Sequence, residues 1–143
     1  MNSYKTILLV EDNPSDIALT KRALEKAKVM NQIIVAEDGQ AALDYLQGGE
    51  TDQPALVLLD LNLPKVSGLE VLKRIRANPR SRRIPVVILT TSNEPHEIAA
   101  GYDLGVNSYL VKPVDFVRFT EVVSHLGLYW LLLNERPPES SQF

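Results

Sequence analysis

The sequence predicts an α/β domain in which parallel strands are covered by helices on both faces. Short apolar runs rich in β-branched residues recur five times, and longer stretches of helical period separate them. The runs are continuously apolar rather than alternating, which is typical of parallel strands buried on both faces. Strands that alternate with helices in this way predict a three-layer sandwich.

Composition narrows the class of protein. A chain of 143 residues with 45% apolar and 23% charged residues suits one globular domain. The absence of cysteine excludes disulfides, thiolate metal sites and cysteine nucleophiles. A formal charge of −3 is too small to indicate binding to nucleic acid or to an anionic membrane.

No segment suggests export or a membrane anchor. The apolar run in "MNSYKTILLVED" is too short for a signal peptide, and "LGLYWLLL" is too short to cross a bilayer. We therefore expect a soluble cytoplasmic protein.

The boundaries of the elements can be read from the sequence. The expected strands are Thr6–Val10, Ile33–Ala36, Ala55–Leu59, Val86–Thr90 and Ser108–Val111. The first helix should begin at Asn13-Pro14, because a cap residue before a proline is a common helix start. A similar start precedes Pro95, and Gly105 should close that fourth helix.

Right-handed crossovers leave few ways to order five such strands. The flavodoxin-like order 2-1-3-4-5, with five helices, is the five-stranded arrangement that fits this pattern. Its ligand crevice lies at the carboxyl ends of the first and third strands. The side chains at those two ends are therefore the first candidates for function.

Both of these strands end in acids. Glu11 and Asp12 follow the first strand, and Asp60 ends the third, in "ALVLLDLNLP". Converging carboxylates repel one another, and Mg²⁺ with its preference for oxygen ligands would neutralise them. Glu11 and Asp12 could instead only cap the first helix, favoured by its dipole. That alternative leaves Asp60 unexplained.

The fifth and fourth strands add a cation and hydroxyl groups at the same edge. Lys112 could hold Asp60 by a charge-assisted hydrogen bond and then pair with incoming phosphate oxygens. Thr90 and Thr91 offer hydroxyl and N–H donors. Taken singly, Lys112 could be an ordinary surface lysine and Thr90 a β-branched strand residue.

Together these groups suit phosphoryl transfer onto Asp60, in which positioning and charge stabilisation do most of the work. An ionised aspartate is already a nucleophile, so the reaction needs no general base. This agrees with the positions of His96 and His125, which we expect to be solvated helix residues away from the crevice.

At this point the chain resembles the receiver domain of two-component response regulators, over roughly residues 5–126. The matching features are the acid pair, the "DLNLPKVSG" segment that begins at Asp60, Thr90, Tyr109 and Lys112-Pro113. Two departures are mild. Glu11 stands where an aspartate is frequent, and Thr91 stands where a small residue is more usual.

The resemblance implies roles for these residues. Asp60 would accept the phosphoryl group of a histidine kinase or phosphotransfer protein. Asp12 and Asp60 would bind Mg²⁺ directly, with Asn62 contributing its backbone carbonyl and Glu11 acting through water.

The resemblance also implies phosphoryl contacts and a switch. Lys112, Thr90 and the N–H of Thr91 would contact the phosphoryl group. Tyr109 would turn inward as Thr90 moves, and Lys112-Pro113 would be a cis peptide. The family's readout face is the fourth helix, the fifth strand and the fifth helix. Because the receiver takes up nearly the whole chain, we expect a stand-alone regulator whose output is a protein contact.

The last helix carries an apolar seam at heptad-like spacing. Its members are Phe116, Phe119, Val123, Leu126, Trp130 and Leu133. We expect a receiver domain over residues 1–133 with an extended last helix, and a disordered tail over 134–143. The excess apolar surface predicts a symmetric homodimer through Tyr129, Trp130 and Leu133, unless it packs on the domain's own loops.

This aromatic C-terminus, together with "RRIPVVILTTSN", resembles the single-domain regulators paired with bacterial phytochrome kinases.

A cluster of basic residues lies in the third helix and the loop that follows it. The cluster is either a solvated face or a docking patch for an acidic kinase surface. Its members are Lys73, Arg74, Arg76, Arg80, Arg82 and Arg83.

Two other classes compete with the receiver. A phosphatase of the haloacid-dehalogenase type would need a second aspartate where Asn62 stands. A flavin binder would need N–H donors where the acids of "EDNPSD" stand.

Overall fold

The computed structural model describes residues 5–48, 53–91 and 95–128, in which strands and helices alternate along the chain. The elements are β1 Ile7–Val10, α1 Pro14–Lys26, β2 Ile33–Ala36, α2 Gly39–Gln47, β3 Leu56–Asp60, α3 Gly68–Ala77, β4 Val86–Thr90, α4 Pro95–Asp103, β5 Ser108–Val111 and α5 Phe116–His125.

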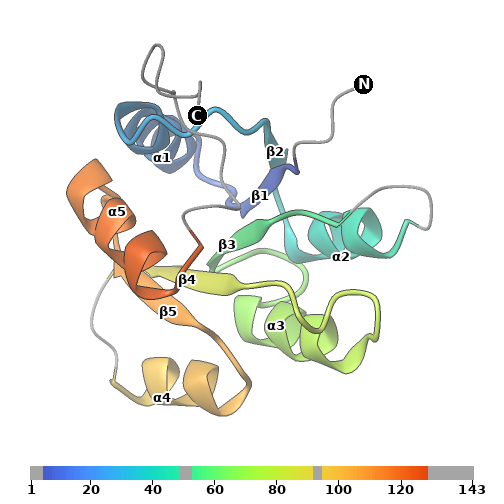
Figure 1. Cartoon of the computed structure of the whole chain (residues 1–143). Helices are drawn as coiled ribbons and strands as arrows, with labels where there is room; N and C mark the ends of the chain where they lie inside the picture. Colours follow the sequence, from blue (N-terminus) through green and yellow to red (C-terminus); the bar gives the residue numbers. More distant parts are fainter. Residues whose placement is uncertain (1–4, 49–52, 92–94, 129–143) are drawn as a thin grey trace, which may run out of the picture.

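The strands form one parallel sheet in the order β2-β1-β3-β4-β5, as Figure 1 shows. This confirms the predicted flavodoxin-like order. Leu9 at the centre of β1 is level with Val35 of β2 and Leu58 of β3. Two strands differ from the prediction by one residue, β1 at its start and β3 at both ends. β1 begins at Ile7, and β3 runs from Leu56 through Asp60. The acidic residue is thus the last residue of the strand.

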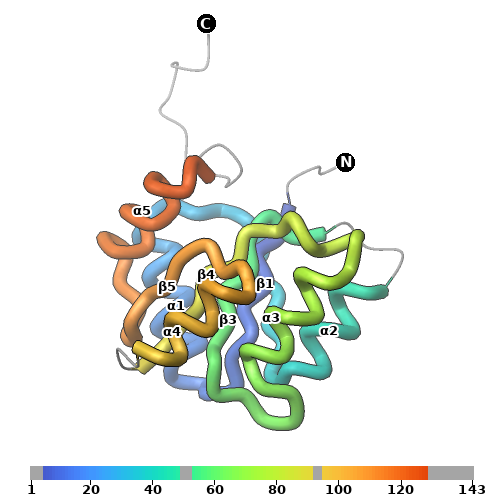
Figure 2. The backbone as a smooth tube through the Cα atoms, turned by 90° about the horizontal axis from the view of Figure 1, so that it is seen from below, coloured from blue at the N-terminus to red at the C-terminus, as the bar shows by residue number. Residues whose placement is uncertain are grey.

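Helices cover both faces of the sheet. α1 and α5 pack side by side on one face, and α2 and α3 lie side by side on the other, with α4 next to α3 (Figures 1 and 2). Alternate residues of β1 enter the two apolar clusters. Ile7 and Leu9 face α1 and α5, whereas Leu8 and Val10 face α2 and α3. Because each strand is buried on both faces, no polar alternation appears in its sequence.

The predicted helix boundaries at Asn13 and Gly105 are confirmed. The side chain of Asn13 accepts a hydrogen bond of 3.1 Å from the backbone N–H of Asp16, capping α1. Gly105 follows α4 with a φ of +96°, which a residue without a Cβ adopts at little cost. The expected cap before Pro95 lies outside the described residues.

The prediction of one continuous last helix is wrong. α5 ends at His125, and Gly127 has a φ of +70°. The N–H groups of Gly127 and Leu128 donate to the carbonyls of Ser124 and Val123, each at 3.0 Å. This pair of bonds is a Schellman motif, which ends a right-handed helix.

The chain beyond this turn is described only as far as Leu128, which is buried in the domain's own core. The side chain of Leu128 is therefore covered by the domain itself and needs no partner protein. Tyr129, Trp130 and Leu133, and the tail over 134–143, lie outside the described residues. Within the described part of the chain, no helix has the length and apolarity needed to cross a membrane.

Candidate functional site

The three predicted acids meet at the carboxyl edge of the sheet. Glu11 follows β1 and Asp60 ends β3, and these strands are neighbours in the sheet. One carboxylate oxygen from each of Glu11, Asp12 and Asp60 lies within 4.8 Å of the others. Glu11 is fully buried and Asp60 is 4% exposed, whereas Asp12 is exposed. Such a buried cluster needs positive charge to be stable.

Lys112 supplies part of that charge. Its Nζ lies 2.7 Å from Oε1 of Glu11 and 3.3 Å from Oδ2 of Asp60, and its side chain is only 9% exposed. The lysine reaches these acids past the end of β4, which separates β5 from β3. Its backbone N–H donates to the carbonyl of Thr90 at 2.7 Å. The predicted pairing with Asp60 is present, but Glu11 is the nearer partner.

Asp16 is a member of this cluster that the sequence reasoning missed. Its Oδ2 accepts a hydrogen bond of 3.1 Å from Nζ of Lys112. Asp16 stands in the first turn of α1, where the Asn13 cap fixes its position. Its position one helical turn after the acid pair could have indicated this role. A helix that starts at this edge of the sheet has its first turn next to the acids.

The burial of the cluster changes how its groups bind protons. Burial raises the pKa of Glu11, and the charge of Asp60 raises it further, while Lys112 and the N–H of Asn13 act in the opposite direction. Burial alone would lower the pKa of Lys112, but Glu11, Asp60 and Asp16 together raise it. The lysine therefore stays charged at neutral pH.

The residues at this edge fit a divalent cation. The ammonium group of Lys112 pairs with three carboxylates, those of Glu11, Asp16 and Asp60, and Asp12 adds a fourth carboxylate beside Glu11 and Asp60. Oε1 of Glu11 is the buried side-chain atom, among the described residues, that has no hydrogen-bond partner. Lys112 contacts this atom as an ion pair at 2.7 Å. Carboxylate oxygens that outnumber the cations beside them form the kind of ligand set that Mg²⁺ prefers.

The carboxylate of Asp60 is held on both sides. The backbone N–H of Asn62 donates to Oδ1 at 3.2 Å, while Lys112 contacts Oδ2. These two contacts restrict the orientation of the buried carboxylate. The side chain of Asn62 is exposed and lies on the loop that follows β3.

The fourth and fifth strands place the other predicted residues. Thr90 is the last residue of β4 and is buried, and Thr91 is exposed directly after it. Tyr109 is half-buried and packs against the apolar cluster beneath α2 and α3. The peptide between Lys112 and Pro113 is cis, as the resemblance implied.

Both histidines lie on helices and are exposed, as expected for solvated helix residues. They are His96 in α4 and His125 at the end of α5.

The predicted basic cluster does not form a single solvated face. Arg74 pairs with Glu70 one turn earlier at 3.0 Å. Arg76 is half-buried and turned toward backbone carbonyls. Either interpretation of the cluster thus has to leave Arg76 out.

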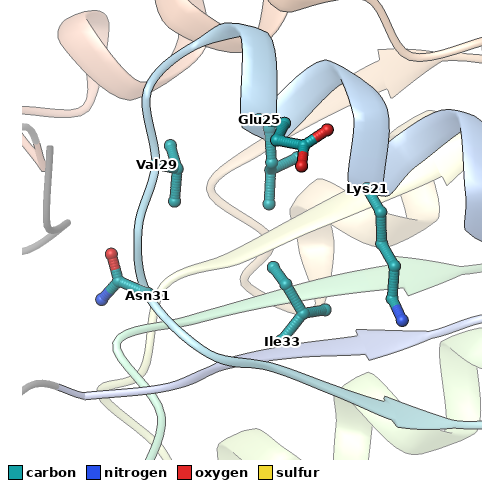
Figure 3. Close-up of a pocket in the computed structure, with 6 residues that line it drawn as sticks. Lys21, Glu25, Val29, Asn31 and Ile33 are labelled. Carbon is teal, nitrogen blue, oxygen red and sulfur yellow. The ribbon is translucent and has the colours of Figure 1, made fainter. Parts of the chain in front are cut away.

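The structure also has hollows away from the acids. One of about 330 Å³ lies between the carboxyl half of α1 and the edge strand β2. Figure 3 shows Lys21 reaching from α1 toward β2, with Asn31 on the segment that leads into β2 and Ile33 at the start of that strand. None of the predicted site residues lines this hollow.

Known proteins share both the sequence and the fold of this chain. A family model described as "Response regulator receiver domain" matches residues 7–124. The chain is 46% identical over 134 residues to the "Probable methanogenesis regulatory protein FilR2" of Methanothrix harundinacea, covering 92% of this chain and 86% of that protein. It is 42% identical over 134 residues to "Response regulator Rcp1" of Synechocystis sp., covering 91% of each.

Solved structures agree with these matches. The bacteriophytochrome response regulator AtBRR is 48% identical, with a TM-score of 0.82, over 94% of this chain and 100% of that one. The Mn(2+)-bound form of Rcp1 is 42% identical, with a TM-score of 0.73, over 93% and 99%. The chain therefore belongs to the family of response regulator receiver domains.

Proposed function

We propose that this chain is a stand-alone response regulator that receives a phosphoryl group on Asp60 from a histidine kinase or a phosphotransfer protein. The observation that carries this proposal is the environment of Asp60. Its buried carboxylate lies beside Glu11 and Asp12 and is contacted by Lys112 at 3.3 Å. The protein is a signalling protein that acts only on its own phosphoryl group, and it passes the signal on by a protein contact.

The reaction is a direct displacement at phosphorus. An oxygen of ionised Asp60 forms a bond to phosphorus as the bond between phosphorus and the donor's imidazole nitrogen breaks. The electron pair of that bond leaves with the imidazole. Mg²⁺ bound by Asp12, Asp60 and the carbonyl of Asn62, with Glu11 acting through water, would neutralise the charge between carboxylates and phosphoryl oxygens.

The chain's own groups position the reactants. Asn62 and Lys112 hold the two oxygens of Asp60 so that the carboxylate presents one face to the donor. As charge builds on the phosphoryl oxygens, Lys112 can exchange its carboxylate contacts for them. The hydroxyl of Thr90 and the N–H of Thr91 complete these contacts.

Phosphorylation then acts as a switch. A phosphoryl group adds about two negative charges and three acceptor oxygens. Thr90 gains a partner that attracts its hydroxyl toward Asp60, and Tyr109 follows by turning inward. The surface formed by α4, β5 and α5 is thereby biased toward its active form.

Acetyl phosphate with Mg²⁺ tests the chemistry without a kinase. Intact mass spectrometry should show the gain of one phosphoryl group by the wild-type chain. The gain should be absent for Asp60→Asn, in which the nucleophile is lost, and absent when EDTA replaces Mg²⁺. A modified Asp60→Asn protein would place the acceptor elsewhere and contradict the proposal.

We propose further that the donor is the kinase of a bacterial phytochrome. The support is the identity of 42–48% to regulators whose names associate them with bacteriophytochromes or to Rcp1. Phosphate transfer from purified phosphorylated kinases would test this. A phytochrome kinase should transfer phosphate to this chain much faster than a chemotaxis or nutrient-sensing kinase does, and equal rates would reject the pairing.

A symmetric homodimer through Tyr129, Trp130 and Leu133 remains part of this proposal. Its support is the run of apolar residues from Tyr129 to Leu133 in the sequence. Sedimentation should show a dimer for the wild type and a monomer for Trp130→Ala. Identical monomeric profiles for the two proteins would remove the dimer.

A further inference from the structure

Arg76, in the last turn of α3, makes four hydrogen bonds to groups outside its own helix. Its Nε donates to the carbonyl of Gly105 at 2.8 Å, and its Nη2 donates to Oδ1 of Asn107 at 2.9 Å. Its Nη1 donates to the carbonyls of Arg82 at 3.1 Å and Ile84 at 2.7 Å. One guanidinium thus ties α3 to the segments that lead into β4 and into β5.

All four acceptors are neutral. Burial lowers the pKa of Arg76, and none of the ion pairs found among the described residues neutralises it. A desolvated cation that has only carbonyl and amide partners is costly to keep. Arg76 contributes a planar guanidinium group, which can donate hydrogen bonds to several acceptors at once.

The turn between α4 and β5 is built around this side chain. Gly105 has a φ of +96°, and a Cβ at this position would lie 3.1 Å from Nε of Arg76. Oδ1 of Asn107 also accepts from the N–H of Val86, at 2.8 Å, so the same atom joins Arg76 to the start of β4. The turn therefore cannot shift without breaking several bonds at once.

α4 itself is held loosely. Gly101 is its buried residue among those described, and a Cβ there would lie 2.6 Å from Cδ1 of Ile88 in β4. The amino end of α4 begins at Pro95, a few residues after Thr90. Figure 1 shows α4 at the margin of the molecule, and α3 is the helix that it contacts among the contacts found. One end of this helix is fixed, and the other end adjoins the phosphorylation site.

We propose that Arg76 is a positioning residue that fixes the carboxyl end of α4 and the start of β5. When Thr90 moves, the amino end of α4 then pivots about this fixed turn. Because the turn itself does not shift, the movement is transmitted to Tyr109. This inference rests on the proposed switch, but the fixed turn itself can be tested without phosphorylation.

Hydrogen exchange of the full chain provides the test, with Arg76→Gln as the variant and Arg74→Gln as its control. Arg74 lies on the same helix but is exposed, and within the described part of the chain its hydrogen bond goes to Glu70. In unphosphorylated Arg76→Gln the amides of residues 104–107 should exchange about 10-fold faster or more, because a charged hydrogen bond is lost to each segment. Amides of β1 and β3 should change much less, and Arg74→Gln should match the wild type.

Beryllium trifluoride with Mg²⁺, a mimic of the phosphoryl group, provides the second measurement. In the wild type it should alter exchange at the amino end of α4 and the environment of Tyr109, and leave residues 104–107 unchanged. In Arg76→Gln the response of Tyr109 should fall by about half or more, while phosphorylation of Asp60 by acetyl phosphate proceeds at the wild-type rate.

Asn107→Asp covers the case in which Arg76→Gln does not fold. The new carboxylate keeps both hydrogen bonds and adds an opposite charge beside the guanidinium, so exchange of residues 104–107 should become slower. Faster exchange there would overturn the inference, as would an Arg76→Gln protein whose exchange rises equally at all amides. A wild type that takes no phosphoryl group would reject the proposed function and leave the exchange result standing.

Discussion

Replacement of Lys112 by methionine is the sharpest test of how the acid cluster is held together. Methionine has a similar length and no charge, so the change removes the ammonium group and little volume. At an effective dielectric constant of about 20, the contacts of 2.7 Å to Glu11 and 3.3 Å to Asp60 are attractions of about 6 and 5 kcal/mol before desolvation. Asp16 is more exposed and adds little.

The net effect is smaller, because removing Lys112 also removes the cost of burying it. We expect Lys112→Met to lower the free energy of unfolding by about 3–5 kcal/mol at neutral pH, as for other broken buried ion pairs. The carboxylates left unpaired cause this loss. Urea denaturation in the presence of a chelator measures it, and the midpoint should fall by about 2 M.

The raised pKa of Glu11 determines whether stability rises or falls with pH. The pKa of Glu11 is raised above its ordinary value of 4.5, so the folded state binds more protons than the unfolded state in the window above 4.5. Its contribution therefore makes stability fall as pH rises through that window. Without Lys112 the pKa of Glu11 rises further, so the loss in Lys112→Met should be largest near neutral pH and should shrink toward about pH 5.

The control is Lys65→Met, which removes a lysine from the same edge of the sheet. Lys65 pairs with Asp38 at 3.4 Å, but its side chain is 68% exposed, so we expect a loss below about 1 kcal/mol with little pH dependence. If Lys112→Met cost no more than this control, or cost the same at about pH 5 and about pH 8, our account of the cluster would be wrong. Millimolar Mg²⁺ should restore part of the lost stability in Lys112→Met.

Three further substitutions test other parts of the structure. Thr90→Ala should leave phosphorylation of Asp60 by acetyl phosphate largely intact but weaken the response of Tyr109, and a wild-type response would contradict the switch. Gly68→Ala should cost about 2–3 kcal/mol and slow phosphorylation, because its Cβ would overlap the carbonyl oxygen of Asp60 and lie 2.6 Å from Cα of Leu61; thermal denaturation and acetyl phosphate kinetics measure the two effects. Gly127→Ala should cost about 1–2 kcal/mol through its φ of +70° alone, since nothing lies within 4 Å of a Cβ there; an unchanged unfolding midpoint would show that α5 does not end in the described turn.

Several features of the last helix and the basic cluster could not be predicted from sequence. The heptad-like spacing from Phe116 onward continues through Gly127 without a break, yet that glycine adopts a left-handed φ and ends α5. The spacing of apolar residues carries no information about the φ angle of one residue, so it cannot predict this helix end. The sequence "KRIRANPRSRR" likewise does not distinguish Arg74, which is exposed, from Arg76, which is half-buried and bonded to backbone carbonyls.

The sequence alone determined the order of the strands and the edge at which the acids meet. Buried parallel strands must be apolar on both faces, so a charge at a strand end stands out in the sequence, as Glu11, Asp60 and Lys112 do. Only the tertiary structure decided that Asp16 joins them, that Lys112 lies nearer to Glu11 than to Asp60, and that Arg76 closes the α4–β5 turn. The physical reason is that strand ends follow from periodicity along the chain. The reach of a side chain across neighbouring elements depends instead on how helices and loops pack on the finished sheet.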